Sequence, residues 1–200
     1  MGLETLLRGL LIGFSIAAPV GPIGVLCIRR TLADGPATGL AAGLGAAAAD
    51  AVYGGIAGFG LPAVSSLLVR QQGLLRLVGG LFLCYLGVRT FMASPARDAA
   101  RVGGAGLLGT FTATFGLTLA NPATILSFVA VFAGLGVAAG GLGGAALVVA
   151  GVFLGSAAWW LILSGGVSLL RARVGPGVLR WVNRLSGIVI LAFGLLALWL

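Results

Sequence analysis

Two short motifs, one in each half of the chain, contain the residues best suited to binding a polar ligand. They read Pro19-Val20-Gly21-Pro22 and Asn121-Pro122, and each interrupts an apolar stretch otherwise long enough to cross a bilayer. Proline lacks an amide hydrogen, so it kinks or ends a helix and leaves an upstream carbonyl without its usual partner. Such backbone is tolerated at membrane depth only inside protein or beside a wet cavity. Matching breaks in the two halves therefore indicate a transport site.

Each break offers its own binding chemistry. The amides that follow the first break would form a new helix N-terminus, where an anionic group such as a carboxylate can bind. The Asn121 side chain adds both a donor and an acceptor at the second break. The alternatives are an ordinary proline kink at the first break and local capping of the freed carbonyl by Asn121 at the second. We expect the following residues to bind substrate: Pro19, Gly21, Pro22, Asn121 and Pro122, with Thr118, Thr124 and Ser127 as further lining residues.

Asp50 is the only acidic residue inside a predicted membrane span, because Glu4, Asp34 and Asp98 lie at the N-terminus or in predicted loops. A carboxylate at membrane depth must face the bundle interior, take a partner or bind a proton. We expect Asp50 to exchange a proton during transport, with Tyr53 as a further lining residue. The alternative is a fixed hydrogen bond, either to Tyr53 or to the backbone freed by the first prolines.

The elements that position these residues are predicted to be membrane helices. Hydrophobic residues make up 60% of the chain and charged residues 8%, whereas a soluble domain has about 25% charged residues. Such a composition indicates an integral, all-α membrane protein forming one transporter domain over residues 1–200. Six spans are predicted at 5–28, 36–60, 72–92, 107–134, 143–170 and 179–200. The segment from Leu61 to Arg70 is either an interfacial helix or a continuation of a span.

The arginines favour six crossings. All 12 basic residues are arginine, and with six spans Arg8, Arg70 and Arg76 fall on one side of the membrane and the other nine on the opposite side. Cytoplasmic loops carry the excess of positive charge, so both termini are predicted outside the cytoplasm.

The two halves of the chain resemble each other weakly. Phe14 through Pro22 reads beside Phe115 through Pro122, and Gly45 has a plausible counterpart in Gly155. Each half has an odd number of predicted spans, so a duplication would place the second half upside down. We therefore expect two inverted three-helix repeats, at 1–100 and 101–200, in which the first and fourth spans are broken.

Several function classes are disfavoured by what the sequence lacks. It contains no histidine, no lysine and no second acid within a span, so no acid/base pair or activated nucleophile is available and we expect no enzyme activity. No phosphate-binding loop of the GxxxxGK[ST] type occurs, which excludes ATP hydrolysis by this chain. The arginines flank the spans and form no basic face, so we expect no nucleic-acid partner. We also expect no cofactor and no metal site.

A series of motifs runs through nearly the whole chain in one order. It comprises Ala18-Pro19-Val20-Gly21-Pro22, Arg29-Arg30 leading to Gly35 and Gly39, Gly45 with Asp50-Ala51-Val52-Tyr53, and Asn121-Pro122. This series resembles the LysE/RhtB family of bacterial amino-acid exporters. The resemblance implies a multi-pass inner-membrane protein that moves amino acids or related metabolites outward at the expense of the proton gradient, as an oligomer. The family's signature residues fall on Pro19, Gly21, Pro22, Asp50 and Asn121-Pro122.

One position departs from the family pattern, and two other functions stay open. Members often have lysine after the Asn-Pro pair, whereas this chain has Ala123, which leaves the substrate class open. A membrane thiol electron carrier would need two cysteines that can meet, but Cys27 and Cys84 do not occupy matching positions in the repeats. A divalent-cation exporter would need more oxygen ligands than one buried carboxylate supplies. Trp159 and Trp160 lie within the fifth span, where we favour packing over a cavity wall.

Overall fold

The computed structural model describes residues 2–19, 21–59, 70–92, 106–121, 124–125, 127–128, 141–171 and 173–199. Within these residues the regular secondary structure is helical. The helices are α1 (Gly2–Ala17), α2 (Pro22–Asp34), α3 (Pro36–Gly58), α5 (Gln72–Phe91), α7 (Gly106–Leu119), α9 (Gly141–Arg171) and α10 (Pro176–Trp199). The predicted all-α fold is therefore confirmed for the described part of the chain.

The helices occupy all six predicted segments, but fewer of them qualify as complete spans. Judged by length and composition over the described residues, three helices can cross a membrane: Pro36–Gly58, Leu142–Arg171 and Gly177–Trp199. The pair α1 and α2 forms a fourth candidate if the two bent helices count as one span. Helix α7 is apolar but shorter than a span, because its regular part ends before Asn121. Most of the segment from Leu61 to Arg70 and the predicted turn near residue 140 lie outside the described residues.

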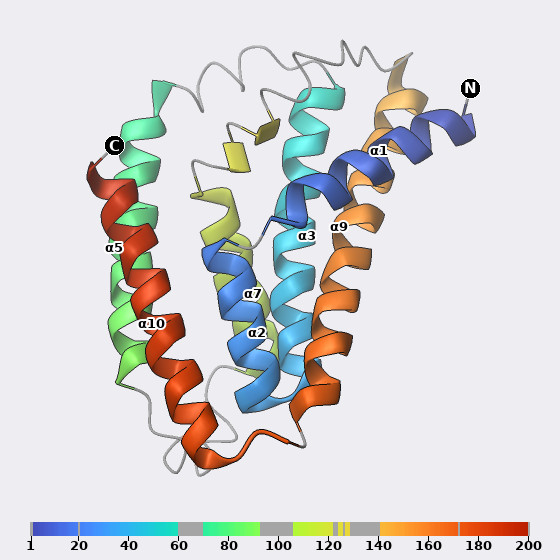
Figure 1. Cartoon of the computed structure of the whole chain (residues 1–200). Helices are drawn as coiled ribbons and strands as arrows, with labels where there is room; N and C mark the ends of the chain where they lie inside the picture. The colour runs from blue at the N-terminus through green and yellow to red at the C-terminus, as the bar shows by residue number, and fades with distance from the viewer. Residues whose placement is uncertain are drawn as a thin grey trace.

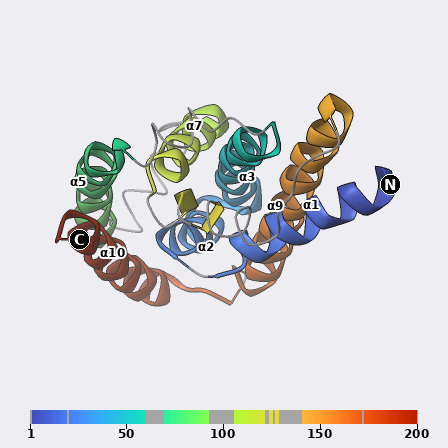
Figure 2. The same ribbon diagram turned by 90° about the horizontal axis from the view of Figure 1, so that it is seen from above.

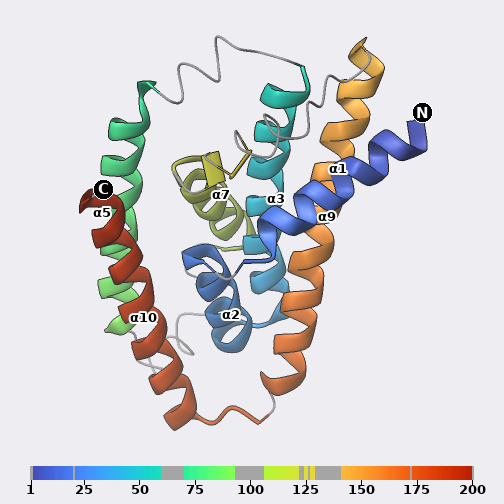
Figure 3. The same cartoon turned by 45° about the horizontal axis from the view of Figure 1, so that its top comes forward.

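The bundle interleaves the two halves of the chain. Helix α1 packs on α9, α3 packs on both α7 and α9, and α5 packs on α10. Figure 1 shows the α5–α10 pair at one side of the molecule and α1 with α9 at the other. Seen from above and tilted forward, α2, α3 and α7 lie between these two groups (Figures 2 and 3). The predicted halves are thus not two separate bodies, since every major helix contact except that of α2 with α3 joins them.

Glycines let these helices approach at backbone distance. A side chain at Gly13 of α1 would overlap the backbone of Val152 in α9, and one at Gly155 of α9 would overlap the backbone of Leu10 in α1. Helices in lipid gain no hydrophobic stabilisation from pairing, so they associate through such close packing. The high glycine content of the chain is therefore used, at these positions, for contacts between its own helices.

A tight turn joins α2 to α3 and needs its glycine. Gly35 has φ +105° and ψ 167°, a conformation that is essentially restricted to glycine. Pro36 then begins α3, where its missing amide hydrogen costs nothing because the first helical amides have no intrahelical acceptor. From the end of α9, Arg171 Nε donates to the Leu32 carbonyl (3.2 Å), which satisfies one free acceptor at the end of α2.

Candidate functional site

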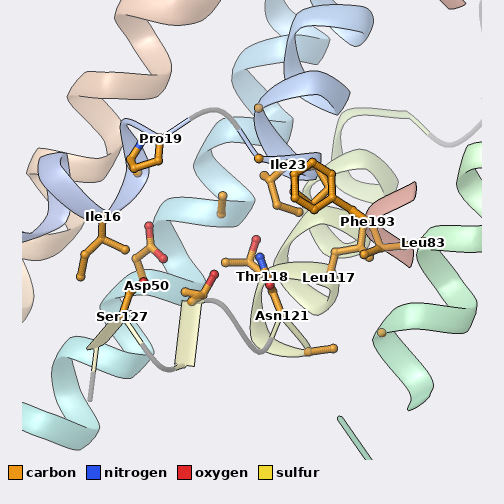
Figure 4. Close-up of a pocket in the computed structure, with 18 of the residues that line it drawn as sticks. Ile16, Pro19, Ile23, Asp50, Leu83, Leu117, Thr118, Asn121, Ser127 and Phe193 are labelled. Carbon is orange, nitrogen blue, oxygen red and sulfur yellow. The ribbon is translucent and has the colours of Figure 1, made fainter. Parts of the chain in front are cut away.

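A cavity of about 510 Å³ lies where the α1–α2 break, the end of α7 and one face of α3 meet. Figure 4 shows Asp50 of α3 directed toward the same space as Thr118 and Asn121 at the end of α7. Eight residues selected from the sequence line this cavity: Pro19, Gly21, Pro22, Asp50, Thr118, Asn121, Thr124 and Ser127. Residues that lie far apart in the sequence are thus brought to one place. Pro122 lies outside the described residues.

The first break turns the chain sharply and exposes a helix start. Helix α1 ends at Ala17, α2 begins at Pro22, and the two helices are bent by 81°. Gly21 is the N-cap residue of α2, in an extended conformation, and no side chain caps the helix. The amides of the first turn have no intrahelical acceptor. Because Ile23 and Gly24 of this turn line the cavity, their amides are placed to meet a ligand.

The second break uses the same local device. Helix α7 ends at Leu119, and the Asn121 amide donates to the Thr118 carbonyl at 3.2 Å. The Asn121 carbonyl then accepts the Ile125 amide (3.2 Å), as the Gly21 carbonyl accepts the Val25 amide (3.0 Å). In both places the residue before proline thus accepts the first bond of the next helical turn.

Asp50 is almost completely buried in the wall of the cavity, with 3% of its surface exposed. Ser156 Oγ donates to Asp50 Oδ2 at 2.7 Å, and Trp160 Nε1 in turn donates to Ser156 Oγ at 3.1 Å. No described residue forms an ion pair with Asp50. The hydrogen-bond partner of the carboxylate is therefore a hydroxyl group on α9. Among the described residues, neither Tyr53 nor the backbone near the first prolines donates to it.

Tyr53 lies next to the cavity lining and fixes the end of α7. Its hydroxyl donates to the Leu119 carbonyl at the end of α7, and its ring lies 5.5 Å from that of Phe128, centroid to centroid. Tyr53 is not among the described residues that line the cavity. It satisfies a carbonyl that the break leaves free and so holds the end of α7 against α3.

The side-chain hydroxyl of Thr118 is buried and has no hydrogen-bond partner among the described residues. The residue is 3% exposed, and its Oγ1 makes no hydrogen bond within the described part of the protein. Buried polar groups are nearly always hydrogen-bonded, because an unpaired one costs about 1–3 kcal/mol. Since Thr118 lines the cavity, a bound ligand could supply the missing acceptor or donor.

Several residues of the site escaped the sequence-based selection. Ser156 donates to Asp50 without lining the cavity itself, and no local signal in the sequence pointed to it. Trp160 lines the cavity, whereas Trp159 packs edge-on against Phe14 with ring centroids 5.5 Å apart. The packing role expected of Trp159 is thus confirmed. Trp160, in contrast, also forms part of the cavity wall. A further wall comes from α5 and α10: Gly79, Leu83, Phe193, Leu196 and Ala197.

The two alternative chemistries find little support in the geometry. Cys27 and Cys84 are both free thiols, with Cys27 Sγ within hydrogen-bonding distance of the Gly39 carbonyl (3.3 Å) and Ser164 Oγ (3.4 Å). Cys84 lies against Gly194 of α10, and the two thiols form no disulfide. Among the described residues, no three side chains of histidine, cysteine, aspartate or glutamate gather at one point that could hold a metal ion.

Comparison with known proteins agrees with this arrangement. The family model of the LysE type translocator matches residues 14–199. The "Putative amino acid efflux protein YcgF" of Bacillus subtilis (strain 168) is 26% identical over 192 residues, covering 92% of this chain and 90% of that protein. The "Uncharacterized membrane protein YahN" of Escherichia coli (strain K12) is 28% identical over 172 residues, covering 84% and 77%. No solved structure matches. The family match extends over both helix breaks and Asp50, and the chain belongs to the LysE type translocator family.

Proposed function

We propose that this protein is a secondary-active exporter of amino acids or related small metabolites across the bacterial inner membrane, driven by proton antiport. The observation that carries the proposal is the convergence of two helix breaks and one buried acid on a single cavity. Helix starts and freed backbone groups suit a carboxylate-bearing substrate. A buried carboxylate that forms no ion pair with any described residue suits a proton. The name of the Bacillus subtilis relative, an amino acid efflux protein, agrees with this reading.

The proposal includes two inverted repeats, and close packing of glycines supports them. Gly45 of α3 faces the backbone of Phe111 and Phe115 in α7. Gly155 of α9 faces the backbone of Leu10 and Phe14 in α1 in the same manner. The contact of the second span with the fourth is thus reproduced between the fifth and the first. Such a match is what a two-fold relation between the halves requires.

The α5–α10 pair supports the same relation. A side chain at Gly80 would meet Leu198, and one at Gly187 would meet Phe91, both within 2.8 Å. Gly87 faces Leu191 as Gly194 faces Cys84. Moving Gly80 forward and Leu198 back by the same number of residues gives the contact of Gly187 with Phe91, and the same shift converts Gly87–Leu191 into Gly194–Cys84. The two helices therefore pack antiparallel about a shared axis.

The repeats differ where the chemistry is expected. The alignment that pairs Gly45 with Gly155 also pairs Asp50 with Trp160, and both residues line the cavity. Under the proposed repeat, the described lining of the cavity has a carboxylate and an indole in equivalent places. We propose that Asp50 alone carries the coupled proton and that Ser156 positions its carboxylate.

The remaining features of the proposal follow from the sequence. From the arginine distribution we propose that both termini lie outside the cytoplasm. The whole chain acts as one transporter domain without enzyme activity, and a homo-oligomer in the bilayer is expected. Alternating access would come from rearrangement of the interleaved repeats around the cavity.

Transport in proteoliposomes tests the proposal. Vesicles containing the purified protein are loaded with a radiolabelled amino acid mixture, and acid outside should accelerate its release. Asp50→Asn should abolish the acceleration, because the side chain can no longer exchange a proton. If the unmodified protein released amino acids at the same rate with and without the proton gradient, proton antiport would be refuted.

A further inference from the structure

We infer that the transported amino acid has an uncharged, apolar side chain, which lies against α5 and α10 while its polar head group faces the two helix breaks. This inference rests on the proposed function and assigns its substrate class. It comes from the division of the cavity into a polar and an apolar part.

The polar part is built by α2, α3 and the end of α7. Asp50 and Ser127 lie on one side of the view in Figure 4, with Thr118 and Asn121 near its centre. Asp50 supplies a negative charge for the ammonium group of an amino acid. The buried Thr118 Oγ1 has no partner in the described part of the protein, and the uncapped first turn of α2 adds free amides. These donors can receive the carboxylate.

The apolar part is built by α5 and α10. Leu83 and Phe193 lie on the opposite side of Figure 4 from Asp50, and Leu196 and Ala197 also line this wall. Leu117 of α7 continues it toward the centre. A head group held between Asp50 and Thr118 therefore directs its side chain toward hydrocarbon, where each buried methylene strengthens binding by about fourfold.

Charge accounting disfavours a charged side chain. Within the described residues, Glu4 pairs with Arg8 and Asp34 pairs with Arg30, and none of these four lines the cavity. The buried guanidinium of Arg29 binds Asn183 Oδ1 (3.1 Å) and also lies outside the cavity lining. The apolar wall thus offers no counter-charge to lysine, arginine, aspartate or glutamate. An unpaired charge there would remain buried at a high cost.

The test measures exchange of single amino acids in proteoliposomes. Vesicles are loaded in turn with radiolabelled leucine, alanine, lysine or glutamate, and counterflow is recorded for each. We expect leucine to exchange at concentrations at least about tenfold lower than alanine, because it buries more methylene groups. Lysine and glutamate should not exchange. Preference for lysine or glutamate would overturn this inference and leave the exporter proposal standing, whereas no exchange of any amino acid would overturn both.

A matched pair of variants tests the wall itself. Leu196 lines the cavity, and its neighbour Leu195 is exposed on α10 without lining it. Leu196→Ala should reduce the preference for leucine over alanine by about fourfold or more, the effect of one lost methylene contact. Leu195→Ala should leave the preference unchanged. If the preference for leucine fell equally in both variants, or did not fall in Leu196→Ala, the substrate side chain would not lie against this wall.

Discussion

Two alanine substitutions test the close helix packing and the proposed repeat together. In Gly45→Ala the new methyl group would overlap the carbonyl oxygen of Phe111, and in Gly155→Ala it would overlap that of Leu10. Both obstacles are backbone atoms within helices, which cannot rotate away as a flexible side chain could. If α3–α7 and α9–α1 are equivalent contacts, the two variants should lose similar stability.

The size of the loss can be bounded. Overpacking of a tight contact costs about 1–3 kcal/mol, because the helices must move apart. The gain in helix propensity from glycine to alanine offsets about 1 kcal/mol of this. For a chain of 200 residues, each kcal/mol changes the melting temperature by about 2–4 °C. The net fall is therefore up to about 8 °C for each variant, since up to about 2 kcal/mol remains.

Two further glycines of the same helices serve as controls. Gly165 of α9 has open space at the position of a side chain, and Gly55 of α3 has only ordinary contacts, the nearest at 3.7 Å. Gly165→Ala and Gly55→Ala should therefore leave stability unchanged or raise it slightly. The assay is the apparent melting temperature in detergent, measured by intrinsic tryptophan fluorescence. If Gly45→Ala and Gly155→Ala were as stable as these controls, the close packing of the helices would be contradicted. If only one of the two lost stability, the proposed repeat would be contradicted.

Three other variants follow from the same geometry. Ser156→Ala removes the donor to Asp50 and the acceptor of the Trp160 indole, and should destabilise the protein by about 1–3 kcal/mol, read as a lower apparent melting temperature. Gly35→Ala forces a side chain into a conformation restricted to glycine and should cost about 1–3 kcal/mol in the same assay; an unchanged melting temperature would mean that the turn adopts another conformation. Replacement of both Cys27 and Cys84 by alanine should retain amino acid efflux, whereas complete loss of transport in a folded double variant would revive the thiol-carrier alternative.

Local signals in the sequence selected the residues that form the centre of the candidate site. Helix α1 ends at Ala17, shortly before Pro19, and Pro22 begins α2, because proline has no amide hydrogen with which to continue a helix. A lone acid such as Asp50 must be enclosed by protein, because lipid cannot solvate it. Both inferences need only the chemistry of one residue and its immediate neighbours. They therefore predicted residues that the fold brings to one cavity.

The partners of these residues could not be predicted, because they depend on helix rotation and register. Ser156 is one serine in a long apolar helix, and only the crossing of α9 over α3 brings it to Asp50. Tyr53 was expected to line the cavity, or else to hydrogen-bond Asp50, yet its hydroxyl donates to the Leu119 carbonyl of α7. The apolar wall to which Phe193 belongs has no sequence signal, since large apolar side chains occur all around α10.

The number of complete spans shows a similar limit. Hydropathy located a helix in each predicted segment, but it could not tell that the regular part of α7 ends at Leu119. A break shortens the helix without making the segment less apolar. Composition thus located the apolar segments, whereas the break in the fourth one was predicted from Asn121-Pro122.

The central claim, that both helix breaks face one substrate cavity, is tested most directly by cysteine accessibility. In a protein lacking Cys27 and Cys84, Ile23→Cys and Thr118→Cys place thiols in the cavity from α2 and α7. Arg173→Cys, exposed just beyond the end of α9 and outside the cavity lining, is the control. We predict that a small methanethiosulfonate reagent labels both cavity thiols and that an amino acid mixture slows both reactions without affecting the control. Labelling of only one cavity thiol, or labelling that the amino acids do not slow, would contradict the shared site.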